Sequence, residues 1–337
     1  MQQRDAICSM TKYEQFLCRG HDFGISPSYR GIQAMAAAKS RRKKYQYNSK
    51  RASHRFGRGF LAFCLAIVLS LATFCYVNAM TIRYRRAIVH INDLPLEFSG
   101  TNLLFISDPL LCGTNTADRF GSILRSMQSL HPDILLLGGN YVSPNPVNAL
   151  TQNSIEGDAD KRLDFARALN AYNAPLGKFA IAGENDGDPA ILQEEMQHYG
   201  VQLLNNSGAR LDKSGKSIYL VGLSSGSGSL NKVSSFVSHE QCVIAAVNDP
   251  SRITDINVSE AQNGGSWVDF CLCGHNLGGQ IEIANRTLIN LTEPQRRFLR
   301  GWFVDQMPIL VSQGLGSKIA NLRFQTQPEI WMITLVQ

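Results

Sequence analysis

The sequence predicts a mixed α/β domain with packed sheets behind a membrane-spanning helix, and three observations predict it. An uncharged apolar run occupies residues 59–80 of the 337. Beyond it, short apolar runs alternate with segments whose apolar residues recur at helical spacing. After residue 200 only strand-like runs follow. Strand–helix alternation followed by a series of strands is typical of a mixed α/β domain.

The apolar run, GFLAFCLAIVLSLATFCYVNAM, has the length and composition of a transmembrane helix. About 20 such residues span roughly 30 Å of hydrocarbon. A buried core helix seldom runs so far without a polar face. A cleaved signal peptide, with Val77-Asn78-Ala79 as its cleavage site, is the other alternative. We favour a retained signal-anchor, because the apolar stretch is longer than a usual signal h-region.

The charges beside this run predict its orientation. Residues 1–58 form a basic tail that we expect to be disordered and cytoplasmic, since 1–38 show no sustained periodicity. From residue 39 to residue 58 no acid interrupts the basic residues, and this cluster outweighs the basic residues after the anchor. The cluster is Lys39, Arg41, Arg42, Lys43, Lys44, Lys50, Arg51, Arg55 and Arg58. The positive-inside rule then places the domain of residues 81–337 on the extracytoplasmic side of a single-pass protein.

The composition narrows the classes of partner. Net charge is +6, but it comes from the tail, while charges beyond residue 81 are mixed, so we expect no nucleic-acid partner. The basic tail also suits anionic lipid headgroups. Among eight cysteines, Cys271 and Cys273 are two apart and point to one face of a strand. That spacing differs from a zinc knuckle, and we interpret both as buried thiols.

The elements of the domain can be placed in order. We expect helices at 120–130, near 165–172, and from a cap at Asp188 with Pro189 in its first turn to Gly200. Residues 143–160 and 224–229 are expected to be loops. The expected strands are 102–107, 133–137, 179–182, 201–204, 218–223, 243–247, 270–273, 281–284, 309–312 and 330–336.

Polar blocks follow several of these strands. They are Ser107-Asp108, Gly138-Gly139-Asn140, Gly183-Glu184-Asn185-Asp186, Asn248-Asp249-Pro250 and Gly274-His275-Asn276-Leu277-Gly278-Gly279-Gln280. Their order and spacing resemble the calcineurin-like metallophosphoesterases over about residues 88–336. The resemblance extends to the bacterial branch with an N-terminal anchor through Asn92-Asp93-Leu94-Pro95, Gly314-Leu315-Gly316, Arg323 and Pro328-Glu329-Ile330.

This resemblance implies a four-layer αββα sandwich with two divalent metals at the carboxyl ends of its strands. In that family the metals activate a water and clamp the phosphate oxygens. The first metal site would be lined by Asp108, Leu110, Asn140 and Leu277. Leu110 and Leu277 stand at histidine positions and Asn140 at the position of the bridging aspartate. Apolar side chains cannot hold a dication, so we expect this site to be lost.

The second metal site would be lined by Asn140, Glu184, Asn248 and His275. Glu184 stands at an asparagine position, Asn248 at a histidine position, and His275 is retained. We expect either no cofactor or one weakly bound divalent metal of the Mn/Zn type. Asn185 stands at the catalytic histidine position, so no catalytic residue is assigned. Asp186 fills an acidic position with an orienting role.

Three of these residues have open alternatives. Asp108 is either a remnant ligand or a cap of the following loop. His275 either binds metal or hydrogen-bonds within its Gly-rich turn. Glu184 either compensates for Asn140 or has drifted into its position.

Three functions remain in competition. The favoured one is a pseudoenzyme of hydrolase ancestry, a binding or scaffolding domain anchored in the membrane. The alternative is a one-metal hydrolase of phosphodiesters or lipid-linked pyrophosphates, such as UDP-diacylglucosamine-type lipids. A third is a binder of phospholipid headgroups or envelope polymers through the old phosphate pocket. Fold analogy alone does not decide among them.

Overall fold

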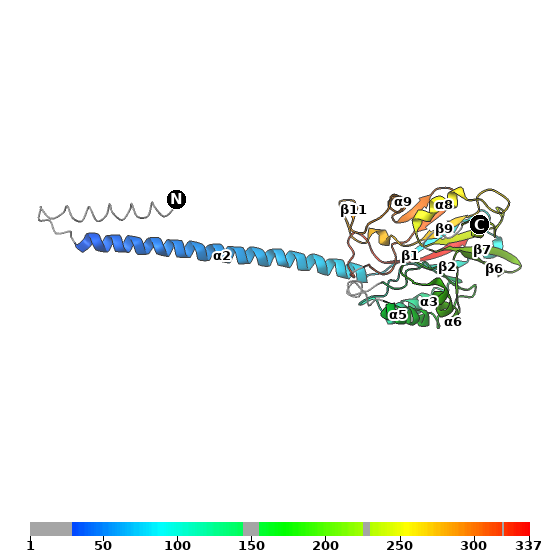
Figure 1. Ribbon diagram of the computed structural model, residues 1–337, viewed down its shortest axis with the longest axis horizontal. Coiled ribbons are helices and arrows are strands. Elements are labelled where there is room, and N and C mark those ends of the chain that lie inside the picture. The colour runs from blue at the N-terminus through cyan, green and yellow to red at the C-terminus, as the bar shows by residue number, and fades with distance from the viewer. Residues whose placement is uncertain (1–28, 144–154, 225–229, 319) are drawn as a thin grey trace. The chain divides into compact units, whose positions relative to one another are not determined.

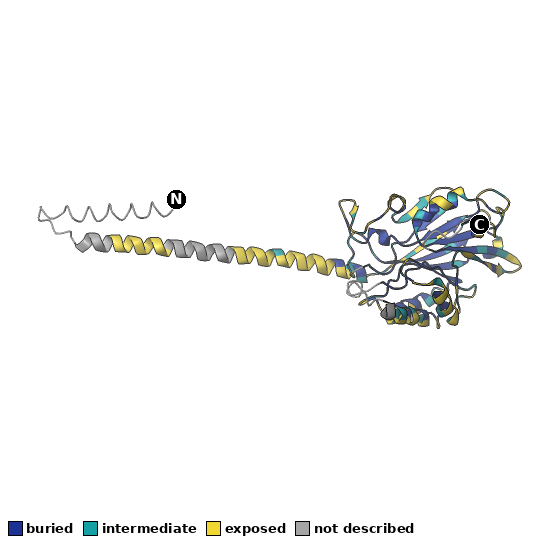
Figure 2. Cartoon of the chain, viewed as in Figure 1, coloured by how far each residue is buried: buried dark blue, intermediate teal, exposed yellow. Residues whose placement is uncertain are grey.

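The computed structural model describes residues 29–143, 155–224, 230–318 and 320–337 (Figure 1). The chain divides into two compact units, Met1–Leu69 and Ser70–Gln337. Helix α2 (Tyr29–Met80) runs from the first into the second. Its segment Gly57–Met80 is 24 residues long and apolar enough to cross a membrane, and it is exposed along nearly all its length (Figure 2). Residues 29–58 are therefore helical, whereas the sequence predicted a disordered tail; residues 1–28 lie outside the described residues.

The second unit contains two six-stranded sheets. Their strand orders are β1-β14-β2-β3-β4-β5 and β12-β13-β9-β8-β7-β6. In the first sheet only the β14–β2 pairing is antiparallel, and in the second the two edge pairings, β12–β13 and β6–β7, are antiparallel. The strands are β1 (Arg83–His90), β2 (Asn102–Ile106), β3 (Ile134–Leu137), β4 (Lys178–Ala180), β5 (Val201–Leu203), β6 (Ser207–Lys213), β7 (Lys216–Leu223), β8 (Val243–Val247), β9 (Phe270–Cys273), β12 (Gly301–Val304), β13 (Pro308–Val311) and β14 (Glu329–Val336).

Helices and short pairings complete the unit. A two-stranded ribbon joins β10 (Glu282–Ile283) to β11 (Arg286–Thr287). The helices are α3 (Ala117–Gln128), α5 (Ile155–Ala168), α6 (Pro189–His198), α7 (Leu230–Ser234), α8 (Ile253–Val258) and α9 (Glu293–Arg297), with 3-10 turns η1 (Leu96–Phe98), η2 (Pro250–Arg252) and η3 (Leu277–Gly279).

Three apolar clusters give this unit four layers. The alternation of side chains along β2 sends Leu103 and Phe105 inward against the second sheet. Leu104 and Ile106 point the other way, into a cluster with α3, α5 and α6. The outer face of the second sheet packs against α7 and α8. Figures 1 and 2 show the helices outside and the buried sheets between them. The predicted αββα sandwich is therefore present.

Several boundaries differ from the prediction. Residues 155–160 begin α5 instead of ending a loop, and 144–154 and 225–229 lie outside the described residues. Strands alone were expected after residue 200, but α7, α8 and α9 follow it. These helices have five or six residues, too few to show a 3.6-residue period. The unpredicted strands are β1, β6 and β12, which lie at sheet edges, and β11 in the ribbon.

Leu136→Ala should destabilise the second unit by about 2–5 kcal/mol, because it opens a cavity between the sheets, where Leu136 is fully buried. Urea unfolding of the full chain in detergent, followed by tryptophan fluorescence, measures this. Leu96→Ala is the matched control, because Leu96 is 71% exposed and its loss should change the free energy of unfolding by under about 0.5 kcal/mol. Equal effects of the two variants would contradict the layered core.

Candidate functional site: the remnant metal centre

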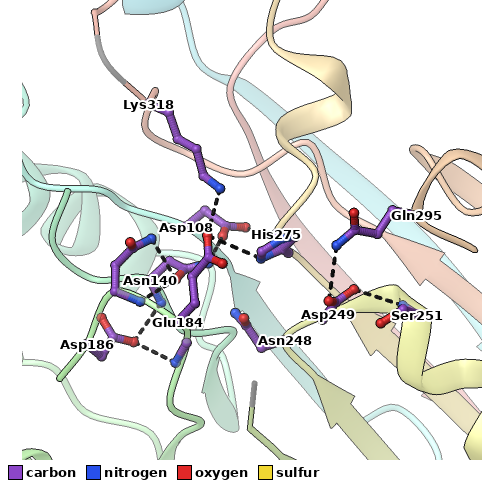
Figure 3. A network of polar contacts seen from close by, with 12 residues as sticks. Asp108, Asn140, Glu184, Asp186, Asn248, Asp249, Ser251, His275, Gln295 and Lys318 are labelled. Atoms are coloured by element: carbon purple, nitrogen blue, oxygen red, sulfur yellow. Dashed lines mark hydrogen bonds and ion pairs between the residues drawn. The ribbon is translucent and has the colours of Figure 1, made fainter. Parts of the chain in front are cut away.

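The strand-end blocks meet at one edge of the sandwich. Strands β2, β3 and β4 of the first sheet run parallel, as do β8 and β9 of the second, so the carboxyl ends within each set lie together. Figure 3 shows Asp108, Asn140, Glu184, Asn248 and His275 gathered at this edge. The structure therefore brings the five residues named from the sequence to one place.

Asp108 is the centre of the group. Its side chain is fully buried, and its Oδ1 accepts a hydrogen bond of 2.8 Å from Asn140 Nδ2. Its Oδ2 accepts one of 2.8 Å from the backbone N–H of His275. Burial raises the pKa of Asp108, partly offset by the hydrogen bond from Asn140 and by His275. Because the second bond crosses to the other sheet, this carboxylate ties the sheets together at the site; it does not simply cap its own loop.

Asn140 uses both ends of its amide within the protein. While Nδ2 donates to Asp108, Oδ1 accepts from the backbone N–H and the Nδ2 of Asn185, at 3.3 and 3.2 Å. The bridging-aspartate position is thus filled by a group that joins two neighbours by hydrogen bonds. The side chain at the catalytic-histidine position, Asn185, is one of those neighbours.

Asp186 orients the same turn from behind. It is fully buried and accepts the backbone N–H groups of Asn140, Tyr141 and Gly183 at 2.7–2.8 Å. Burial raises its pKa to about 6, with the three N–H donors acting in the opposite direction. Its geometry is that of an orienting residue, as the sequence analysis expected.

Lys318 places a positive charge at the second expected metal site (Figure 3). Its Nζ lies 2.8 Å from Glu184 Oε1, and His275 Nδ1 lies 4.0 Å from the same oxygen. Burial acts to raise the pKa of Glu184, but the hydrogen bond and the charge of Lys318 outweigh this effect. The pKa of Glu184 is therefore lowered from its ordinary value. Lys318 was missed by the sequence analysis, since it belongs to none of the strand-end blocks.

Two buried atoms at this second metal site have no hydrogen-bond partner among the described residues. They are His275 Nδ1 and Asn248 Oδ1. The Asn248 amide otherwise donates to the carbonyl of Gly138, at 2.8 Å, and so also links the two sheets. Unpaired polar atoms in a buried setting are costly and are usually satisfied by water, an ion or a ligand.

The backbone at the lining positions is strained. Asp108, Leu110, Asn140, His275 and Leu277 all have φ between 47° and 74°. This left-handed region costs a residue with a side chain roughly 1–2 kcal/mol. Strain of this kind is typical of ligand and active sites. The left-handed backbone thus includes Leu110 and Leu277, whose apolar side chains cannot bind a metal.

A buried arginine holds the loop beside the first site. Arg323 is fully buried and donates to the carbonyls of Gly314 and Leu277 at 3.2 and 3.3 Å. Burial lowers the pKa of Arg323 to about 10, and the charge of Asp108 acts in the opposite direction. At the same edge the backbone of Gly274 lies close to Asp108, because a Cβ atom on Gly274 would be only 2.6 Å from Asp108 Oδ2.

A two-metal centre does not fit these side chains. In the described part of the chain, no three His, Cys, Asp or Glu side chains are grouped so that they could hold a metal ion. Leu110 and Leu277 are buried at the first site, and the oxygens of Asp108 already accept protein donors. At the second expected metal site, the groups that remain to bind a metal among the described residues are Glu184, His275 and the unpaired amide oxygen of Asn248. Lys318 already forms an ion pair with Glu184.

Known proteins are similar over most of the chain. No family model matches it. An uncharacterized metallophosphoesterase of Aquifex aeolicus is 21% identical over 276 residues, covering 80% of this chain and 97% of the relative. The uncharacterized metallophosphoesterase YkuE of Bacillus subtilis is 23% identical over 258 residues, covering 72% and 81%. The crystal structure of the calcineurin-like phosphoesterase YfkN of Bacillus subtilis gives a TM-score of 0.31 at 10% identity, covering 64% and 82%.

With its paired sheets and strand-end site, the chain is similar to these two proteins named as metallophosphoesterases. Its assignment to the membrane-anchored branch stays a prediction.

Asp186→Asn should change how stability depends on pH. Because the folded-state pKa of about 6 lies above the ordinary 3.8, the contribution of Asp186 is fully present below about pH 4 and is lost as pH rises through 6. The variant lacks this titration and also loses an acceptor for backbone N–H groups. Its deficit in the free energy of unfolding should be largest near pH 4 and shrink by about 3 kcal/mol towards pH 7. Urea unfolding across this range measures it, and a deficit that does not vary with pH would contradict the assignment.

Proposed function

We propose that this protein is a membrane-anchored binding domain with a phosphoesterase fold that has lost the family's two-metal hydrolysis. One observation carries the proposal: the residues at the metal positions bond to one another. Asp108 and Asn140 share a buried hydrogen bond, and Asn185 donates to Asn140. Two-metal hydrolysis needs carboxylates and imidazoles that face the metals and a free group at the catalytic position.

The charges of the site support the same proposal. Lys318 faces Glu184 from one side, and the charge of Arg323 acts on Asp108 from the other. Metals would otherwise supply the positive charge that compensates these carboxylates. Here protein side chains supply it, so these carboxylates are compensated by charges of the chain itself.

A second candidate keeps one metal and some hydrolysis of lipid-linked phosphoesters. It is favoured by the unpartnered atoms His275 Nδ1 and Asn248 Oδ1 beside Glu184. A cation bound there would have to displace Lys318 from Glu184. Membrane anchoring through residues 59–80, with the domain outside the cytoplasm, is part of both candidates.

A phosphodiesterase assay distinguishes the two candidate functions. We expect the full chain, purified in detergent, to hydrolyse bis(p-nitrophenyl) phosphate no faster with Mn²⁺ or Zn²⁺ than buffer does. The second candidate requires metal-dependent turnover that both His275→Ala and Glu184→Ala abolish. His239→Ala is the control, because His239 is exposed and bonds to Ser266 away from the site. Turnover that survives the control but is lost in both site variants would overturn the first proposal.

Metal-binding side chains introduced at the positions with left-handed backbone should produce a metal site. We expect Leu110→His, Asn140→Asp and Leu277→His together to give the chain at least one bound Zn²⁺ or Mn²⁺, because the backbone at these positions keeps its left-handed conformation. Titration calorimetry and elemental analysis measure this against the unsubstituted chain. Adding Asp108→Ala should remove the new site. If the triple variant folds, as shown by circular dichroism, and binds no metal, these positions no longer converge on one point.

A further inference from the structure

A second pocket lies apart from the remnant metal centre, at the end of α2. Its volume is about 540 Å³. Residues distant in sequence line it: Phe74 near the end of α2, Arg83 and Arg85 on β1, Arg300 before β12, and Phe324 before β14. All belong to the compact unit Ser70–Gln337. The pocket thus combines two aromatic side chains and three guanidinium groups with uncharged polar side chains, which are those of Asn78, Gln313, Gln325, Thr326 and Gln327.

Two of the arginines are held in place by buried carboxylates. Arg85 Nε lies 2.8 Å from Glu329 Oε2, and its guanidinium stacks 5.5 Å from the ring centroid of Trp331. Arg300 lies 2.6 Å from Glu282 Oε2. Each guanidinium has five N–H donors, so donors remain after these contacts. Fixing an arginine before its ligand arrives lowers the entropy lost on binding.

Arg83 supplies the uncompensated charge. It is exposed and makes no ion pair among the residues that the structure describes. On β1 it alternates with its neighbours, so that Arg83 and Arg85 share one face of the strand while Arg86 lies on the other. Glu329 and Glu282 offset the other two charges, which leaves a net positive pocket whose excess is Arg83.

Two aromatic side chains, Phe74 and Phe324, also line the pocket. Phe74 is 58% exposed and lies within the apolar segment Gly57–Met80. Its ring meets that of Phe324 edge to face, with centroids 6.2 Å apart. An anion that carries an apolar chain could contact both the arginines and the two rings, whereas a free anion would leave the rings without a partner.

The positions of the lining residues along the chain indicate where the pocket would lie relative to the membrane. If Gly57–Met80 crosses the membrane, Phe74 lies inside its end and Arg83 only three residues beyond it. Such residues lie at the level of the lipid phosphates, and arginine binds phosphate through paired N–H donors. We propose that this pocket binds the phosphate of an anionic phospholipid, with the acyl chain against Phe74 and Phe324. The proposal rests on the membrane anchor, and it does not depend on whether the remnant metal centre hydrolyses anything.

The test compares the retention of two lipids. The full chain is reconstituted in nanodiscs with equal amounts of phosphatidylglycerol and phosphatidylcholine, and native mass spectrometry of the released protein measures which lipid stays bound. We expect phosphatidylglycerol to be retained preferentially. Arg83→Gln should lower that preference about fivefold, as loss of one arginine near the headgroups does. Arg83→Glu should lower it further.

Arg86→Gln is the matched control, since it removes the same charge from the opposite face of β1 and should leave the preference unchanged. An equal loss in Arg83→Gln and Arg86→Gln would overturn the pocket in favour of a general surface charge. No preference in the unsubstituted chain would overturn it as well. Binding of sn-glycerol 3-phosphate as strongly as of the lipid would assign the pocket to soluble phosphates instead. Extraction with alkaline carbonate shows separately whether each variant is still anchored, so a failed anchor and a failed pocket are distinguishable.

Discussion

The buried carboxylate of Asp108 is the interaction on which the site depends. It accepts from Asn140 on one sheet and from the backbone of His275 on the other. A charge so deeply buried is tolerated only when donors satisfy it. The donors therefore keep the strand ends of both sheets in register, and the remaining site residues, Glu184 and Asn185 among them, are positioned by the same turns.

The four-layer arrangement makes this possible. Strands with apolar residues on both faces are covered by the opposite sheet on one side and by helices on the other, so their carboxyl ends meet at a buried edge. The polar groups there must be satisfied by metals or by one another. In this chain Asn140 satisfies Asp108, and Lys318 satisfies Glu184.

Much of this was predictable from the sequence, because strand-end blocks carry a local signal. Strands 243–247 and 270–273 were predicted with the boundaries that β8 and β9 show, since both are short, wholly apolar runs. β1 and β6 were missed because their polar, alternating residues do not stand out as buried strands. Lys318 was missed because its role depends on a contact 134 residues away in sequence, for which no spacing gives a signal.

The hydrogen bond between Asp108 and Asn140 has a consequence for the life of the protein in a cell. Many small metalloproteins fold only when their ion is supplied, because the free energy of metal binding is part of their folding free energy. In this chain the strand edge is closed by a hydrogen bond between an amide and a carboxylate. Manganese or zinc starvation, or a strong chelator, should leave the abundance of this protein unchanged while depleting those relatives that depend on a filled metal centre to fold.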